Sequence, residues 1–507
     1  MGLIQFANFV LFVHLRFVSS EKDEEWSFPK GFLIGTATSA YQIEGGWNAS
    51  DKGENVWDRY THTQPDRIPN MDNGDIACDS FHKYKTDVQL LKKLGVDHYR
   101  FSISWSRILP TGYANIISKD GVQFYNNLLD ELEKNNIIPL VTIYHWDHPQ
   151  IFQDIGGWTN EAMVDLFGDY ARVVYQEFGH RVKMFITINE PNIVCLNEYY
   201  TGNYAPGLRI GKYAEYLCTH NIIKAHARAY HIYDKEFRSK QQGKIGIVVD
   251  CDQHYAKYEN DTLSPEVAFQ YQCGRYGGPI FSEQGDYPDV IKKRIAENSE
   301  YEGLKRSRLP VFSKQWIDYI KGSADFFGLN HYRSRLVEPA PKPSNTVYLN
   351  DDGLIYSYDP NSPSTATKRV KIVPEGFTDI IRKIKKEFNN PEIFVTENGI
   401  PDNGTLDDDQ RIEYLQKYMK AMLTAIKKYN CNVKGYTVWS LMDNFEWEYG
   451  YSSKYGLFHV DFNDSKRART PKKSVAWFTD VLRTRKLSDI GIQPSSKEEN
   501  KASTLQV

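Results

Sequence analysis

The 507-residue chain has little cysteine, no long basic tract and no apolar run of membrane length. Its six cysteines are too few for a disulfide-stabilised scaffold, although one or two bridges remain open and the sequence does not pair them. The 62 Lys and Arg residues are balanced by 65 Asp and Glu residues, so no positive excess is available to neutralise a phosphate backbone or an anionic membrane. A membrane helix needs about 18 consecutive apolar residues, which no segment has. We therefore expect no nucleic-acid partner and no membrane span.

Hydrophobic and aromatic residues are abundant. Hydrophobic residues make up 41% of the chain and charged residues 25%, which is typical of a folded globular protein. The chain contains 34 Tyr, 26 Phe and 10 Trp. Part of this surplus must pack the core, and the rest suits a site that stacks on flat apolar faces such as those of sugar rings.

The N-terminal segment resembles a secretory signal. Leu3 to Val18 is mostly apolar, residues 18–20 are small enough for cleavage, and a charged stretch follows at once. His14 and Arg16 interrupt the apolar run, and no Lys or Arg precedes it. We expect a signal peptide over residues 1–20 and a secreted, extracellular protein. Four N-x-S/T sequons are expected glycosylation sites, namely Asn48, Asn260, Asn403 and Asn463.

Apolar periodicity predicts amphipathic helices separated by short strands. Apolar residues step by three and four over Phe81–Leu91, Phe124–Leu132, Met163–Phe178 and Ile412–Ile426, which is the period of a helix with one buried face. Near-continuous apolar strands between such helices indicate a parallel sheet that is covered on both faces. Such units fit an α/β fold with a single (β/α)8 TIM barrel, whose chemistry would lie at the carboxyl ends of the strands. The predicted strands are Phe32–Ala37, His98–Ile103, Pro139–Tyr144, Lys183–Ile188, Lys244–Val249, Phe326–His331, Glu392–Thr396 and Val433–Val438.

No linker divides the chain, so we expect one barrel domain over residues 21–485. Pro339 to Pro374 is rich in Pro, Ser, Asn and Asp and is predicted to form a long loop over the barrel mouth after the sixth strand. Long loops at this end of a barrel shape access to the site. Residues 486–507 are polar and are predicted to form a flexible tail.

Polar and aromatic residues gather where the predicted strands end. A lone carboxylate there is more often an ion-pair partner or a helix cap, but seven strand ends that meet at one mouth favour a site. In a closed barrel, Glu190 and Glu397 would face each other. Glycoside cleavage needs such a pair, because one acid protonates the leaving oxygen while a carboxylate attacks or activates water from the opposite face. The strand-end residues are Gln42, Arg100, His145, Trp146, Asn189, Glu190, Asn330, Tyr332, Glu397, Trp439, Glu446 and Trp447.

Four segments carry a resemblance to a known family. The chain resembles glycoside hydrolase family 1 from about Trp26 to Leu482. Within that family its sequence is most similar in pattern to secreted insect β-glucosidases and myrosinase-like members. The resemblance implies a retaining β-glucosidase that acts on a small-molecule β-glucoside and needs no cofactor and no metal. The sequence leaves a homodimer open. The matching segments are Asp97–Arg107 (DHYRFSISWSR), Ile186–Pro191 (ITINEP), Phe394–Gly399 (FVTENG) and Ser440–Trp447 (SLMDNFEW).

The resemblance also implies a role for each matched residue. Glu190 would be the general acid/base and Glu397 the nucleophile. Arg100 and Tyr332 would flank Glu397 and keep it ionised, and the charge of Glu397 would raise the pKa of Glu190. Once Glu397 is glycosylated that charge disappears, so the acid would become the base that activates water. The residues expected to bind the sugar are Gln42, His145, Trp146, Asn189, Asn330, Tyr332, Trp439, Glu446, Trp447 and Tyr455.

Departures from the family pattern lie on the aglycone side. Arg333-Ser334-Arg335 follows Tyr332 where small residues are usual, and residues 274–278 and 374–376 also differ. Arginine N–H donors hold anions well, so the alternative function is a myrosinase-like thioglucosidase, with Arg333 and Arg335 recognising the sulfate of glucosinolates. Both arginines could instead face solvent or bridge a loop carboxylate. The plant-type myrosinase is excluded, because it has Gln where this chain has Glu190.

Two rival classes and one substrate class have less support. A metal-dependent hydrolase could use His145, Asp147 and His148, but Pro149 follows directly and no second pair of His lies at another strand end. A catalytically inactive sugar-binding relative would typically lack one of the two carboxylates, and this chain has both. Members that act on phosphorylated sugars have Ser in place of Glu446, whose carboxylate would repel phosphate.

Overall fold

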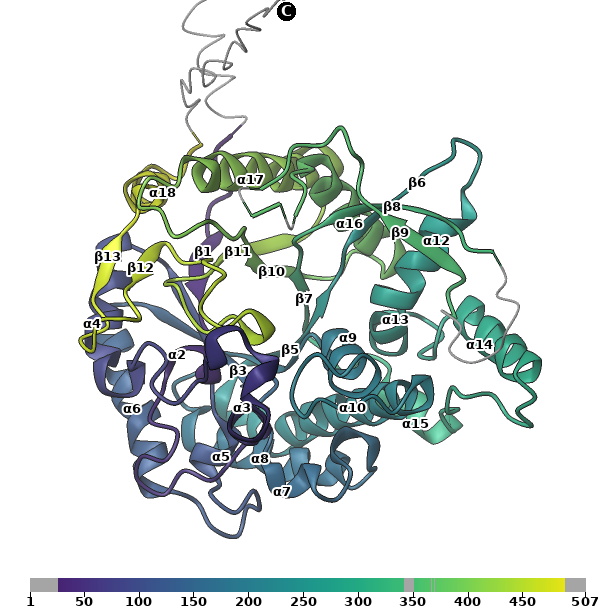
Figure 1. The fold of residues 1–507 in the computed structure, drawn as a ribbon, viewed down its shortest axis with the longest axis horizontal. Coiled ribbons are helices and arrows are strands. Elements are labelled where there is room, and N and C mark those ends of the chain that lie inside the picture. The colour runs from purple at the N-terminus through teal and green to yellow at the C-terminus, as the bar shows by residue number, and fades with distance from the viewer. Residues whose placement is uncertain (1–25, 342–350, 366, 369, 488–507) are drawn as a thin grey trace, which may run out of the picture.

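The computed structural model describes residues 26–341, 351–365, 367–368 and 370–487. Eight parallel strands follow one another around a closed barrel, and the last strand pairs with the first (Figure 1). The predicted TIM barrel is confirmed, and each strand begins and ends within one or two residues of its predicted position. The strands are β1 (Leu33–Ala37), β2 (His98–Ser102), β3 (Ile138–Tyr144), β4 (Met184–Asn189), β5 (Lys244–Asp250), β7 (Phe326–Asn330), β10 (Ile393–Asn398) and β11 (Val433–Trp439).

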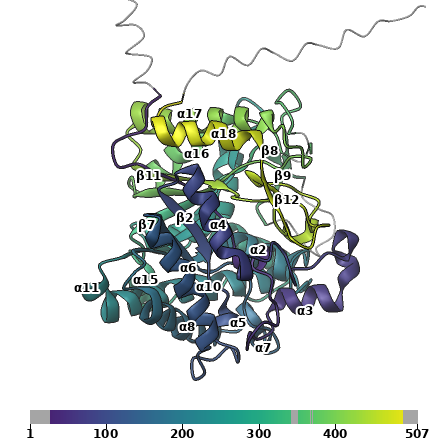
Figure 2. The ribbon, with the colours of Figure 1, turned by 90° about the vertical axis from the view of Figure 1, so that its left-hand side faces the viewer.

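Helices surround the barrel on its outer side (Figures 1 and 2). The four helices predicted from apolar periodicity are present as α4 (Ser80–Leu94), α6 (Lys119–Lys134), α8 (Met163–Phe178) and α17 (Asp409–Tyr429). Gly95 ends α4 with a φ of +78°, a conformation that L side chains rarely adopt. The other long helices are α10 (Lys212–Ile232), α14 (Asp289–Tyr301), α16 (Pro374–Glu387) and α18 (Lys473–Thr484).

The inside of the barrel is divided into two layers. Leu140, Ile186, Val248, Phe326 and Phe394 form a separate buried apolar cluster. Side chains two residues apart on a strand point to the same face, so positions further along these strands also face inward. There the inward positions are polar, with Thr142 on β3 and Thr396 on β10 as examples. The apolar layer therefore closes the barrel below a polar layer at the carboxyl ends of the strands.

The long loop predicted over Pro339–Pro374 is partly wrong, because this region contains strand structure. A small sheet is formed by β6 (Gln253–Ala256), β8 (Ser334–Pro339) and β9 (Leu354–Ser357), with β8 between the other two. Antiparallel pairing of β8 with β9 satisfies backbone groups that a loop would leave to solvent. The sheet extends outward from the ends of β5 and β7 (Figure 1). Part of the predicted loop lies outside the described residues.

Two disulfides tie the segments after β4 and β5 to nearby helices. Cys195, which follows the short helix α9 (Pro191–Val194), is bonded to Cys218 in α10, and Cys251 after β5 is bonded to Cys273. The bridges left open by the sequence are thus present in these two pairs. Cys78 and Cys431 are free and buried.

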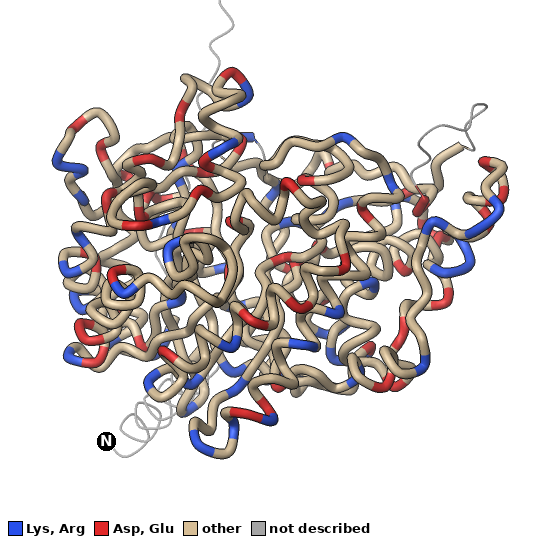
Figure 3. The backbone as a smooth tube through the Cα atoms, turned by 90° about the horizontal axis from the view of Figure 1, so that it is seen from below, with Lys and Arg blue, Asp and Glu red and all other residues tan. Residues whose placement is uncertain are grey.

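The predicted signal peptide and most of the predicted tail lie outside the described residues. The described fold ends at Leu487, whose backbone N–H donates to the carbonyl of Trp26. No helix in the described part of the chain is long and apolar enough to cross a bilayer. Over the described residues in Figure 3, the Lys and Arg positions along the backbone are interspersed with Asp and Glu positions rather than gathered into one basic stretch.

Candidate active site

A buried arginine connects three strands at the carboxyl end of the barrel. Arg100 on β2 is 1% exposed, and its guanidinium donates to Oε1 of Glu397 at 2.5 Å and to Oδ1 of Asn189 at 2.6 Å. It also donates to Oγ1 of Thr142 at 3.1 Å and to the carbonyl oxygen of Thr396 at 3.0 Å. A buried cation is tolerated when it is paired and its remaining N–H groups are satisfied. Arg100 therefore holds side chains of β3, β4 and β10 in fixed positions.

Both carboxylate oxygens of Glu397 accept hydrogen bonds. The phenol of Tyr332 donates to Oε2 at 2.6 Å, while Arg100 occupies Oε1. Burial, and then the charge of Glu397, raise the pKa of Tyr332 well above its ordinary value, so the phenol remains a donor. Charge-assisted hydrogen bonds on both oxygens orient this carboxylate at the end of β10.

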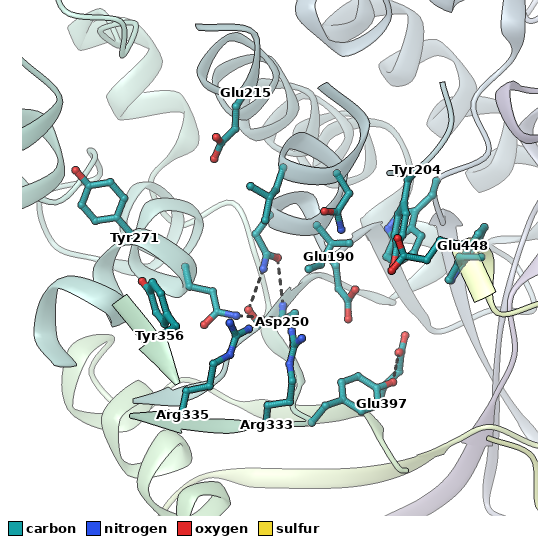
Figure 4. A pocket seen from close by; sticks show the side chains of 18 of the residues that line it. Glu190, Tyr204, Glu215, Asp250, Tyr271, Arg333, Arg335, Tyr356, Glu397 and Glu448 are labelled. Carbon is teal, nitrogen blue, oxygen red and sulfur yellow. Dashed lines mark hydrogen bonds and ion pairs between the residues drawn. The ribbon is translucent and has the colours of Figure 1, made fainter. Parts of the chain in front are cut away.

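Glu190 follows β4 directly and begins α9. Its Oε1 accepts a hydrogen bond from Nδ2 of Asn330 at 2.5 Å, and the side chain is nearly buried. Burial, and then the charge of Glu397, raise the pKa of Glu190 well above its ordinary value. Glu190 and Glu397 point into one cavity (Figure 4). A protonated carboxyl and an oriented carboxylate in one cavity are the pair that acid catalysis with a nucleophile requires.

Aromatic side chains form one wall of this cavity. The rings of Trp146 and Trp447 lie 4.6 Å apart between centroids, and His145 stacks at 6.0 Å on both Trp439 and Trp447. Burial, and then the charge of Arg100, lower the pKa of His145 well below its ordinary value, so its ring is neutral.

Trp146, Glu190 and Trp447 have φ values of +75°, +46° and +50°. Such backbone strain in non-glycine residues tends to gather at functional sites.

Gln42 and Glu446 lie together at the β1 and β11 side of the site. Nε2 of Gln42 donates to the carbonyl oxygen of Phe445 at 2.8 Å and lies 3.4 Å from Oε2 of Glu446. Ser39 donates to the amide oxygen of Gln42 at 2.7 Å. These bonds fix an amide and a carboxylate beside the aromatic wall.

The cavity has a volume of about 520 Å³ and lies over the carboxyl ends of the strands. Most residues that the sequence analysis singled out line it, and four lie directly behind it. Gln42, Arg100, Asn189 and Asn330 form this second set, and each is hydrogen-bonded to the lining or to another of the four. Among the predicted residues, the lining contains His145, Trp146, Glu190, Tyr332, Arg333, Arg335, Glu397, Trp439, Glu446, Trp447 and Tyr455.

Comparison with known proteins identifies the family to which this barrel and its two facing carboxyls belong. Residues 24–487 match Glycosyl hydrolase family 1. The chain belongs to this family. It is 47% identical to Myrosinase 1 of Brevicoryne brassicae over 91% of this chain and 100% of that protein. It is 40% identical to the human cytosolic beta-glucosidase over 90% of this chain and 98% of that protein.

Solved structures of family 1 glycosidases agree with this assignment. The aphid myrosinase structure superposes with a TM-score of 0.87 at 46% identity, covering 91% of this chain and 100% of that chain. The family 1 b-glucosidase from Thermotoga maritima superposes with a TM-score of 0.83 at 37% identity, covering 91% of this chain and 99% of that chain. The fold and the general activity, hydrolysis of glycosides, follow from membership of the family.

The two arginines that the sequence analysis associated with an anion are already paired in this family 1 glycosidase. Nη2 of Arg335 lies 2.6 Å from Asp252, and Nε of Arg333 lies 3.3 Å from the same carboxylate. Nη2 of Arg333 also lies 3.5 Å from Asp250. Both arginines line the cavity, but they bridge carboxylates at the end of β5 and just after it, which was one of the alternatives left open.

Sequence reasoning missed the contribution of the fifth strand. Asp250 ends β5, is 2% exposed and lines the cavity near Glu190. The strand-end rule that found residues on the seven other strands would have found Asp250 as well. Gln272 and Arg275 come from the segment of Cys273 and had no periodic signal, because the disulfide and a π-helical turn place them.

The histidine cluster considered as a metal site does not converge. His148 faces away from the cavity, where its ring contacts the hydroxyl of Tyr144 at 3.1 Å and the amide of Gln153 at 3.2 Å. Among the described residues, no group of three or more His, Cys, Asp or Glu side chains is arranged to hold a metal ion.

Proposed function

We propose that this family 1 glycosidase is a retaining β-glucosidase that removes terminal non-reducing β-D-glucosyl residues. The observation that carries the proposal is the pair of Glu190 and Glu397 in one cavity, where burial and the charge of Glu397 raise the pKa of Glu190 while Arg100 and Tyr332 order Glu397. Retaining glycosidases need such carboxyls about 5–5.5 Å apart on opposite faces of the scissile bond.

In the proposed reaction, Glu397 attacks the anomeric carbon while Glu190 gives its proton to the leaving oxygen. The bond to the aglycone breaks as the bond to Glu397 forms, which leaves a glucosyl-enzyme and a free alcohol. Glu397 then carries no charge, so one cause of the raised pKa of Glu190 disappears. Glu190 now accepts a proton from water, whose oxygen bonds to the same carbon as the bond to Glu397 breaks, which frees the Glu397 carboxylate and releases glucose with retained configuration.

The residues around this pair suit a neutral sugar. Asn189, fixed by Arg100, is positioned for the hydroxyl next to the anomeric carbon, and Gln42, His145 and Glu446 present donors and acceptors for the others. The aromatic wall covers the apolar face of the ring. The other residues assigned to this sugar subsite are Trp146, Asn330, Tyr332, Trp439, Trp447 and Tyr455.

A thioglucosidase acting on glucosinolates is the second candidate, because Myrosinase 1 of Brevicoryne brassicae is 47% identical and Arg335 lines the cavity. Against it, the guanidinium of Arg335 is engaged by Asp252, so a sulfate would have to compete with a buried carboxylate. We therefore place the O-glucosidase first. Purified enzyme assayed on matched O-glucosides and glucosinolates decides between the two, and a higher kcat/KM on glucosinolates would reverse the order.

Labelling with a 2-deoxy-2-fluoroglucoside that carries a good leaving group tests the mechanism. The fluorine slows both steps and the good leaving group rescues the first, so a glucosyl-enzyme should accumulate on Glu397. Peptide mass spectrometry locates the label, and NMR of the first-formed anomer reports retention. A label on another residue, or an inverted product, would contradict the assignment.

We further propose that the protein is secreted after removal of residues 1–20 and is N-glycosylated. Disulfides such as Cys195–Cys218 persist in oxidising compartments. Mass analysis of the protein from an insect secretory host, before and after an N-glycan-removing enzyme, tests both expectations. The sequon residues that the structure places at exposed positions are Asn48, Asn260, Asn403 and Asn463.

A further inference from the structure

Arg411, near the start of α17, is a buried cation outside the cavity. It is 1% exposed and does not line the cavity. Its Nε, Nη1 and Nη2 atoms donate one, two and two hydrogen bonds, which matches the five N–H groups of a guanidinium. The side chain therefore connects several separate segments. The acceptors are the carboxylates of Asp402 and Asp408 and the carbonyl oxygens of Ile400, Lys454 and Tyr455.

One of these contacts restrains the segment that leaves the nucleophile. Nη1 of Arg411 donates to the carbonyl oxygen of Ile400 at 2.5 Å, three residues after Glu397. Between the two lies Gly399, where an added Cβ would lie 2.1 Å from the carbonyl oxygen of Trp439 at the end of β11. The chain beyond Glu397 is thus pressed against the neighbouring strand end and hydrogen-bonded to α17, so it has little freedom to move.

A second contact of the same nitrogen restrains the wall beside the nucleophile. Nη1 of Arg411 also donates to the carbonyl oxygen of Tyr455 at 2.9 Å, and the N–H of Ser440 donates to that oxygen at 3.2 Å. Tyr455 lines the cavity, and its ring meets the ring of Tyr332 edge-on at 6.2 Å. The phenol of Tyr332 in turn donates to Oε2 of Glu397. Both contacts of Nη1 therefore lead to the same carboxylate.

Buried ionic groups hold the guanidinium itself in place. Nε of Arg411 donates to Asp408 at 2.9 Å, and Nη2 donates to Asp402. The carboxylate of Asp408 also accepts hydrogen bonds from the N–H and the hydroxyl of Ser474, at 2.7 and 2.6 Å. Nζ of Lys472 donates to Asp402 at 2.8 Å. Charge-assisted hydrogen bonds are short and directional, so this network gives the guanidinium one position.

We propose that Arg411 is a positioning residue for the nucleophile, because it joins the segment after β10 to the segment that carries Tyr455 into the cavity. Arg411 contacts neither the sugar nor the reacting atoms, and its effect passes through Ile400 and Tyr455. A displacement of about 1 Å at the reacting atoms can cost about 100-fold in rate. The inference rests on the proposed function, because it concerns how the same Glu397 is held.

Arg411→Lys tests the positioning role, with 2,4-dinitrophenyl 2-deoxy-2-fluoro-β-glucoside as the probe. Lysine keeps the charge beside Asp402 and Asp408, but its compact ammonium cannot bond all the acceptors of a planar fork. We expect the limiting first-order rate constant for labelling of Glu397 to fall by about 10-fold or more, because the nucleophile is misplaced. The fall should exceed any change in the half-saturating concentration of the probe.

The labelled fraction separates positioning from a merely structural role. A structural role would lower the fraction of molecules that become labelled, measured by intact-protein mass spectrometry, and leave the rate constant of the remaining molecules unchanged. In Arg411→Lys we expect the reverse, with the folded protein labelled completely but slowly.

Arg469→Lys is the matched control. Arg469, in β13 (Arg469–Pro471), has a side chain that is 3% exposed, and it bonds the carboxylate of Asp87 and the carbonyl oxygen of Arg467. None of these three residues lines the cavity. This variant should lower stability and leave the labelling rate constant unchanged. A fall in Arg411→Lys no larger than that in Arg469→Lys would overturn the assignment.

Asp402→Asn keeps the test decisive if Arg411→Lys does not fold. The amide retains an acceptor for Nη2 of Arg411 but removes the charge that orients it. Its labelling rate constant should also fall, by a smaller factor than for Arg411→Lys, and a value equal to that of the control would overturn the assignment.

Labelling of the wild type distinguishes the failure of this inference from the failure of the proposed function. A wild-type enzyme that is not labelled on Glu397 would reject the proposed mechanism itself. If the wild type is labelled on Glu397 and Arg411→Lys reacts at the same rate, the positioning role alone is rejected and the retaining β-glucosidase stands.

Discussion

The guanidinium of Arg100 lies 2.5 Å from Oε1 of Glu397, and both side chains are almost completely buried. Each therefore depends on the other, because neither charge has water to replace a lost partner. The proposed catalytic arrangement and the stability of the barrel are coupled at this contact.

Replacing Arg100 by Met should destabilise the protein and abolish most activity. Loss of one partner of a buried pair leaves an uncompensated charge and costs about 3–5 kcal/mol of unfolding free energy. Arg172→Met is the matched control, because Arg172 forms ion pairs with Asp169 and Glu236 on the exposed surface, which are worth at most about 1 kcal/mol. Denaturant unfolding of both variants measures the difference, and equal losses would contradict it.

Glu190→Ala should impair substrates according to their leaving groups. A poor leaving group such as an alkyl alcohol needs the proton of Glu190, whereas an activated nitrophenolate leaves without it. We expect the loss in kcat/KM to be at least about 100-fold greater for the alkyl glucoside, within the range that general acid catalysis supplies. Steady-state kinetics on the two substrates check this, and equal losses would exclude Glu190 as the acid.

The alkaline limb of the pH profile should report Glu190. Because burial and the charge of Glu397 raise the pKa of Glu190, its protonated form persists to higher pH than that of an exposed glutamate. Activity should then fall as pH rises through that pKa. In Glu397→Gln one cause of the shift is removed, so the titration of Glu190, followed by carbon NMR, should move to lower pH. A midpoint that stays unchanged or rises would argue against coupling of the two carboxyls.

Glu397→Gln should itself abolish turnover and should cost less stability than Arg100→Met, because the amide removes the charge that pairs with Arg100 but keeps an acceptor for it and a similar shape. Differential scanning calorimetry and the assay on an activated aryl glucoside measure the two effects separately. Substantial residual activity would reject Glu397 as the nucleophile.

Arg335→Ala distinguishes the two candidate functions. If Arg335 recognises sulfate, this variant should raise KM for sinigrin and leave KM for an O-glucoside unchanged. If Arg335 serves only to neutralise Asp252, as its 2.6 Å contact suggests, KM for sinigrin should not respond selectively. Steady-state kinetics with both substrates give the answer, and we expect the second result.

Opening the Cys195–Cys218 bridge should lower stability by about 3 kcal/mol, from the loop entropy of a 23-residue separation. The double variant Cys195→Ala/Cys218→Ala tests this by thermal unfolding. Cys431→Ala, which removes a free cysteine, is the control and should cost less.

The barrel was predictable because its strands are apolar throughout and its helices have one buried face. Glu190 and Glu397 were predictable because each is a polar residue at the end of such a strand, and Arg100 because it is a charged residue within one. Asp250 obeys the same rule but was missed, and the sequence left ion pairs of Arg333 and Arg335 open as an alternative without identifying Asp252 as their partner. Pairing of those arginines depends on how the segment after β5 folds back beside β8, and neither periodicity nor spacing encodes that contact.

The apolar layer below Arg100 closes the barrel at one end, so substrate enters and both products leave through one opening. In the proposed reaction, the glucosyl group is joined to Glu397, and glucose would depart only after the aglycone has left the entrance. An alcohol that enters before water would then encounter the glucosyl-enzyme. A cavity with a single opening would thus impose an order of product release, the aglycone before glucose. It would also allow transglycosylation, in which an incoming alcohol accepts the glucosyl group and becomes a new glucoside.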